Sequence, residues 1–124
     1  MLGSALVMPT LPVVDLERAK KFYQEILGLK VAYENPGGAV MECGNGTKLL
    51  LYPRDATRAD HTAAGFEVQD VEKEVRELKA KGEVFEEYDT PDLKTVDSIA
   101  SRGSAKGAWF KDTEGNIIGV ANMG

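Results

Sequence analysis

The sequence has only one cysteine, one histidine and one tryptophan, and it has no long apolar run. The single cysteine, Cys43, excludes an internal disulfide bond, so we expect a reducing, cytoplasmic location. The first eight residues have neither the charged start nor the apolar run of a signal peptide. No stretch is long and apolar enough to predict a transmembrane helix, and we therefore expect no membrane partner.

Positive charge is also scarce, with 15 Lys and Arg residues against 20 Asp and Glu residues and a net charge of −5. Binding to nucleic-acid phosphates needs a basic face, and no basic stripe with interleaved aromatic residues occurs. We therefore expect no nucleic-acid partner. The length of 124 residues and the 43% of hydrophobic residues predict one compact domain with a core.

One pattern occurs twice, 55 residues apart. Asp15 and Asp70 each precede an amphipathic run, and Gly28 and Gly82 close the two runs. Asp is a good N-cap and Gly is a good residue just beyond a helix end, so each run predicts a helix. A repeat near half the chain length implies two similar modules. Modules that pack face to face create a cleft, which is where small molecules bind.

Strand-like segments accompany each predicted helix. In the first module they span residues 5–11, 29–34, 39–43 and 48–52. In the second module they span residues 62–68, 83–87, 106–111 and 117–121. Each module is therefore β-α-β-β-β, and the predicted fold class is α+β. We expect a single domain, 1–124, made of module one at 4–53, a polar linker at 54–60 and module two at 61–124.

Three segments carry a family resemblance. They are Leu-Pro-Val-Val-Asp-Leu-Glu-Arg-Ala at 11–19, Phe-Glu-Val-Gln-Asp-Val at 66–71 and Trp-Phe-Lys-Asp-Thr-Glu-Gly-Asn at 109–116. In this order they resemble the vicinal oxygen chelate superfamily, which includes glyoxalase I, bleomycin-resistance proteins and extradiol dioxygenases. Thr113 stands where the closing motif usually has Pro. The resemblance implies paired βαβββ modules whose curved sheets enclose one cavity, and it implies a frequent dimer.

The resemblance also implies metal ligands on the first and last strands of each module. There, His, Glu or Gln side chains hold a divalent ion with nitrogen and oxygen donors. The four matching positions are Met8, Leu50, Ala63 and Gly119, and none of them supplies such a donor. Moving the alignment by one residue brings in no usual ligand. We therefore expect no metal and no other cofactor, and an apolar cavity in place of a chelating centre.

Strand parity predicts the lining of that cavity, because successive strand residues face opposite sides. Trp109 faces the cavity if Phe110 packs against the helices; otherwise Trp109 is a core or sheet-surface residue. Glu67 is either a cavity carboxylate or a solvated strand end. Gly65 and Gly119 would leave room for a ligand. The predicted ligand-binding residues are Met8, Thr10, Leu50, Tyr52, Glu67, Trp109 and Gly119.

We assign no catalytic residue. His61 follows a polar linker and favours a surface position, and Cys43 shows no partner that would activate it. The favoured function is a metal-independent protein that sequesters or senses an apolar or amphipathic small molecule, as a homodimer. One alternative is a lyase, isomerase or dioxygenase of the same superfamily that uses Glu67, His61 or ligands missed by the alignment. Another is a dimerisation domain with a filled cavity.

The long polar loop at 89–104 is a further candidate. Leu93, Val96 and Ile99 recur in it at helix-like spacing, so we predict a lid that closes on the ligand or on the partner subunit. The alternative is a surface excursion that packs on its own module. The acidic residues just before the loop, Glu86 and Glu87, favour a solvated edge.

Overall fold

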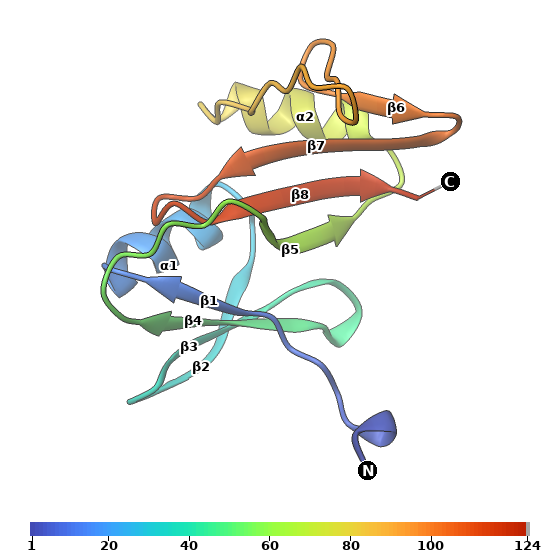
Figure 1. The fold of residues 1–124 in the computed structure, drawn as a ribbon. Coiled ribbons are helices and arrows are strands. Elements are labelled where there is room, and N and C mark those ends of the chain that lie inside the picture. The colour runs from blue at the N-terminus through green and yellow to red at the C-terminus, as the bar shows by residue number, and fades with distance from the viewer. Residues whose placement is uncertain (124) are drawn as a thin grey trace. The chain divides into compact units, whose positions relative to one another are not determined.

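The computed structural model describes residues 1–123, and the chain divides into two compact units, residues 1–56 and residues from Thr57 onward. Each unit contains one α-helix and one four-stranded sheet (Figure 1). The predicted α+β class with two βαβββ modules is confirmed. Gly124, the end of the predicted second module, lies outside the described residues. Within residues 1–123, no helix combines the length and the apolar character needed to cross a membrane.

The sheet of the first unit has the strand order β1-β4-β3-β2. Its strands are β1 (Thr10–Val13), β2 (Lys30–Asn35), β3 (Gly38–Glu42) and β4 (Lys48–Pro53). β1 runs parallel to β4, and the other neighbours are antiparallel. Most of the strand predicted at 5–11 lies outside β1, because Leu6 and Val7 are over 90% exposed and have nothing to pack on.

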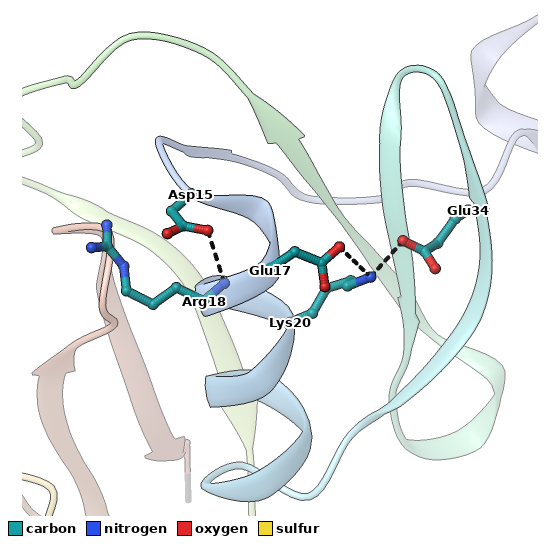
Figure 2. Close-up of polar contacts among 5 residues, drawn as sticks. All are labelled: Asp15, Glu17, Arg18, Lys20 and Glu34. Carbon is teal, nitrogen blue, oxygen red and sulfur yellow. Dashed lines mark hydrogen bonds and ion pairs between the residues drawn. The ribbon is translucent and has the colours of Figure 1, made fainter.

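The helix α1 (Leu16–Glu25) begins as predicted at Asp15. The Asp15 carboxylate accepts a hydrogen bond from the Arg18 backbone N–H at 3.1 Å (Figure 2). Farther along α1, Lys20 Nζ lies 3.0 Å from Glu17 Oε1 and 2.8 Å from Glu34 Oε1 on β2 (Figure 2). Lys20 donates hydrogen bonds to Glu34 and to Glu17, and these raise the pKa of Lys20, the bond to Glu34 most, so Lys20 stays charged and links the helix to the sheet.

The core of the first unit lies between α1 and one face of the sheet. Burial alternates along β4, where Leu49 and Leu51 are buried while Leu50 and Tyr52 are half-buried. This alternation is expected when a helix covers only one face of a sheet. The buried side chains of this unit include Leu11, Val13, Ala19, Phe22, Tyr23, Ala39 and Met41.

The sheet of the second unit has the matching order β5-β8-β7-β6. Its strands are β5 (Thr62–Glu67), β6 (Ala100–Arg102), β7 (Ala105–Lys111) and β8 (Ile117–Asn122). The helix α2 (Val71–Ala80) packs on β7 and β8, and the Asp70 carboxylate accepts from the Lys73 backbone N–H at 3.0 Å, as predicted for an N-cap. The buried apolar side chains here include Ala64, Val71, Val75, Phe85, Ala108, Phe110, Ile118 and Val120.

The prediction of a strand at 83–87 is wrong. Only one isolated bridge forms there, between Phe85 and Phe110, and the Glu86 N–H donates to the Trp109 carbonyl at 2.8 Å. The edge strand is β6, which lies inside the segment predicted as the loop 89–104. The free edge of β7 is therefore shared, because residues 85–86 cover one half and β6 covers the other.

Candidate ligand-binding cavity

The first unit gathers three predicted site residues on the sheet face away from α1. Thr10 pairs with Leu50, and two residues farther on Pro12 pairs with Tyr52. Residues two apart share a face, so Thr10, Leu50 and Tyr52 lie on one side of the sheet. Met8 is half-buried but precedes β1.

The second unit gathers Trp109 and Gly119 in one row across its sheet. Gly65 on β5 pairs with Gly119 on β8, and Gly119 pairs with Trp109 on β7. The neighbouring Phe110 is buried together with Ile118, its partner across the strands. The half-buried Trp109 therefore lies on the face away from α2, since adjacent strand residues face opposite sides.

The indole of Trp109 covers two glycines. A Cβ atom placed on Gly119 would lie 3.4 Å from Nε1 of Trp109, and one on Gly107 would lie 3.3 Å from Cη2. The expected room above Gly119 is therefore filled, by the indole and by the Thr62 methyl group, which would lie 3.3 Å from the same Cβ. A Cβ on Gly65 would meet nothing within 4 Å, so the space above Gly65 is open.

An open cavity of about 350 Å³ lies beside Trp109, entirely within the second unit. Its volume falls in the range of small-molecule sites. The indole forms one wall, and Leu93, which precedes β6, contributes another. The remaining lining residues are Asp92, Lys94, Ala100, Ser101, Arg102, Ala105, Lys106, Gly107, Ala121, Asn122 and Met123. Trp109 also meets Tyr88 edge to face, with ring centroids 5.6 Å apart.

The segment 88–99, here called the excursion, is held by the Glu87 carboxylate. Glu87 Oε1 accepts from Thr95 Oγ1 at 2.6 Å and from the Ser98 N–H at 3.1 Å, and Oε2 accepts from Ser98 Oγ at 3.0 Å. The Thr95 hydrogen bond, helped by those from Ser98 and opposed by desolvation, lowers the pKa of Glu87. Glu87 is exposed, as expected for a solvated edge, and its carboxylate also holds the excursion in place.

The excursion is folded as turns, although its apolar residues recur at helix-like spacing. Val96 and Ile99 form a bridge around Asp97 and Ser98, which both have positive φ angles of 50° and 77°. Leu93 lines the cavity, whereas Val96 is 66% exposed. The lid stays a prediction, and Leu93 is the residue of the segment that is placed to cover the cavity.

The other residues weighed for chemistry lie elsewhere. Glu67 is exposed at the end of β5. The side chain of His61 is 75% exposed, with Nδ1 3.5 Å from the Asp60 carboxylate. Burial, and then the charge of Glu42, raise the pKa of the Cys43 thiol, so it is held in its protonated, weakly nucleophilic form.

The four positions at which the resemblance implies metal ligands do not fit a divalent ion. Met8 offers a thioether, Leu50 and Ala63 offer alkyl groups, and Gly119 has no side chain. Such ions prefer oxygen and nitrogen donors. In the described part of the chain, no three His, Cys, Asp or Glu side chains form a group able to hold a metal. Metal independence stays a prediction.

The chain belongs to the Glyoxalase/Bleomycin resistance protein/Dioxygenase superfamily, whose family model matches residues 5–120. The resemblance seen in the sequence is thereby confirmed. A comparison with curated proteins finds no match.

Several solved structures share the fold. The fosfomycin resistance protein FosX from Listeria monocytogenes is 18% identical, with a TM-score of 0.73 over 98% of this chain and 94% of FosX. Lactoylglutathione lyase from Agrobacterium tumefaciens is 23% identical, with a TM-score of 0.69 over 96% and 93% of the two chains. UcmS2 is 17% identical, with a TM-score of 0.71 over 94% and 98%. At these identities the likeness concerns the fold alone.

Sequence reasoning missed most of the cavity walls. Arg102, Lys94, Gly107 and Met123 line the cavity but were not among the predicted site residues. A signal for β6 was present, because Gly103-Ser104 is a two-residue turn flanked by strand-compatible residues, and Gly103 has a φ of 63°. Recognising this hairpin would have placed Arg102 and Ala105 opposite each other.

Proposed function

We propose that this protein binds a small apolar or amphipathic molecule without a metal, and that it sequesters or senses the molecule and does not transform it. The observation that carries the proposal is the cavity beside Trp109. Its walls combine an indole with aliphatic side chains from Leu93, Ala105 and Met123 and a few polar groups. Small-molecule sites in proteins have this composition.

The side chains weighed for acid–base chemistry support binding over catalysis. A general base needs a partner that orients it and a position within reach of the substrate. Neither Glu67 nor His61 lines the cavity, and both are exposed. The protonated Cys43 lies in the first unit and is equally absent from the lining. We therefore assign no bond-making step to this site.

The residues first predicted to contact the ligand belong to both units. In the second unit, Trp109 would contact the ligand in the cavity, and Gly119 would support its indole. The other predicted contacts, Met8, Thr10, Leu50, Tyr52 and Glu67, do not line this cavity and stay predictions. We further propose a homodimer, as superfamily members typically form dimers and closed two-fold assemblies are the commonest.

The experiment is to purify the protein without a chelator, measure bound metal by elemental analysis, and record native mass spectra for co-purified small molecules. A FosX structure contains Mn(II) and 1S,2S-dihydroxypropylphosphonic acid, so metal binding is the competing hypothesis that the elemental analysis tests. We expect less than about 0.1 metal ion per chain. A metal bound one to one and retained on dialysis would overturn the proposal and favour an enzyme.

A variant that fills the cavity tests whether the ligand binds there. Ala105 lines the cavity, so Ala105→Phe should block it and abolish ligand-induced quenching of Trp109, the only tryptophan of the chain. Ala80→Phe, at the exposed end of α2, is the matched control and should bind as the parent does. If Ala105→Phe binds the ligand as tightly as the parent does, the ligand site does not lie in this cavity.

A further inference from the structure

The charges around the cavity point to the class of ligand. Three basic residues line it, Lys94, Arg102 and Lys106, against the single acidic residue Asp92. This excess runs against the composition of the chain, whose net charge is −5. A positive cavity in an acidic protein concentrates anions locally while the rest of the surface repels them.

Two of the three cations are available to a ligand. Lys106 Nζ lies 2.6 Å from Glu72 Oε2 on α2, so its charge is already compensated. Arg102 Nη2 lies 3.4 Å from the backbone carbonyl of Asp92, a contact that leaves the guanidinium charge uncompensated. Lys94 makes no ion pair with any residue of the described chain. With the Asp92 carboxylate counted, one positive charge remains in excess.

The indole of Trp109 and the guanidinium-bearing residue Arg102 lie toward opposite ends of one side of β7. Arg102 pairs with Ala105 at the start of β7, and Ala105, Gly107 and Trp109 then follow on the same face. Four residues of β-strand rise about 13 Å. Because an arginine side chain is long, a fused two-ring molecule with one polar substituent is large enough to bridge the rest of this distance.

We propose that the ligand is an amphipathic anion with a planar aromatic body. Its rings lie against Trp109 and Leu93, and its carboxylate, or a comparable oxyanion, is held by Arg102 and Lys94. Arg suits this role because its planar guanidinium matches the two oxygens of a carboxylate. This inference rests on the proposed function and names the ligand class for the same cavity.

Three probes of one shape and different charge test the inference: 2-naphthoate, 2-naphthalenemethanol and 2-naphthylmethylammonium. Calorimetry gives the affinities, and the indole N–H signal of Trp109, the single tryptophan, reports the place of binding in proton–nitrogen NMR spectra. We expect naphthoate to bind about 10-fold or more tightly than the ammonium probe, with the alcohol between them. The naphthoate affinity should fall as salt is raised.

Variants that each remove one positive charge test where the anionic group of the ligand binds. Arg102→Gln and Lys94→Gln should each weaken naphthoate binding by about 3- to 10-fold and leave naphthalenemethanol binding unchanged. Arg76→Gln and Lys73→Gln, exposed on α2, are matched controls that should leave both affinities unchanged. Circular dichroism verifies that all four variants fold.

The outcomes separate the two proposals. If the alcohol or the ammonium probe binds as tightly as naphthoate, or if Arg102→Gln and Lys94→Gln bind naphthoate normally, the anion inference is overturned while the binding function stands. If none of the three probes shifts the Trp109 signal at millimolar concentration, the proposed binding function itself is overturned.

Discussion

Trp109 illustrates how glycines position a large side chain on a sheet. Gly107 and Gly119 lack the Cβ atoms that would lift the indole off the strands. The ring therefore lies close to the backbone and presents one face to the cavity. Tyr88 meets its edge and limits how far it turns. A flat, restrained indole is a good contact surface because little conformational entropy is lost when a ligand stacks on it.

Adding a methyl group at Gly119 should disturb this arrangement. The new Cβ would lie 3.3 Å from the Thr62 methyl group, which must move by a few tenths of an ångström, and 3.4 Å from the indole nitrogen, which it would contact directly. We expect Gly119→Ala to change the Trp109 emission spectrum and to lower the free energy of unfolding by about 1 kcal/mol. Gly65→Ala, where the Cβ meets nothing within 4 Å, is the control; it should leave the emission spectrum unchanged and should not lower the free energy of unfolding. Identical spectra for the two variants would contradict the packing described.

Glu83 carries a second prediction at the residue scale. Burial, and then the nearby charge of Asp112, raise the pKa of Glu83 to about 7. Because this value lies above the unfolded-state value of about 4.5, the protonated form stabilises the fold. The contribution is fully present below pH 4.5 and is lost as the pH rises through 7.

Glu83→Gln should therefore gain stability over the parent at pH 8 and not at pH 4.5. We expect the gain to be about 1 kcal/mol or less, because the side chain is partly exposed and its charge is screened. Urea unfolding at the two pH values measures it. Glu77→Gln, on exposed α2 surface, is the control. A gain of equal size at both pH values would contradict the assignment.

At the scale of elements, the excursion depends on one carboxylate. Glu87 holds Thr95 and Ser98, and these keep the chain around Leu93 against the cavity. The pKa of Glu87 is lowered, so its contribution is present above the unfolded-state pKa and is lost as the pH falls through the folded-state value. The excursion should therefore loosen in acid.

Glu87→Ala should release the excursion without unfolding the second unit. We expect faster hydrogen exchange at the backbone amides of residues 95–99 and a several-fold weaker affinity for 2-naphthoate. Glu86→Ala, which removes only a 3.6 Å ion pair with Lys111, should leave both unchanged. Unchanged exchange in Glu87→Ala would show that the excursion is held by other contacts.

The elements that were predicted correctly are those determined by local chemistry. Asp15 and Asp70 cap both helices through their own carboxylates, and Gly28 and Gly82 adopt the positive φ angles that end them. The strand predicted at 83–87 failed because its pairing depends on which segment reaches the free edge of β7. The pairing is decided by tertiary structure, and β6 occupies one half of that edge while residues 85–86 cover the other.

The candidate site was predictable only in part for the same reason. Strand parity gave the shared face of Leu50 and Tyr52 and the outward position of Trp109, since these need only the alternation within a strand. Lys94 lines the cavity because of the turns of the excursion, which no local pattern fixes, whereas Arg102 does so through the β6 hairpin, whose Gly103-Ser104 turn signal was overlooked.

At the scale of the whole molecule, the 55-residue repeat predicted two similar units, and the matching strand orders of the two sheets show them. The oligomeric state of the protein is a prediction. Leu2, Leu6 and Val7 are more than 85% exposed, and such apolar surface is costly unless something covers it. We expect a homodimer of about 27 kDa, twice the chain mass of 13.5 kDa, in light scattering at micromolar concentration. A monomer throughout that range would contradict it.

The most direct test of the account is a calorimetric titration of 2-naphthoate into protein that has been dialysed against EDTA and shown by elemental analysis to be metal-free. We expect saturable binding, one ligand per chain, with a concurrent shift of the Trp109 indole signal and no change in affinity when Mn(II) is added. Binding that appears only after a divalent metal is restored would contradict the account, as would no binding at all.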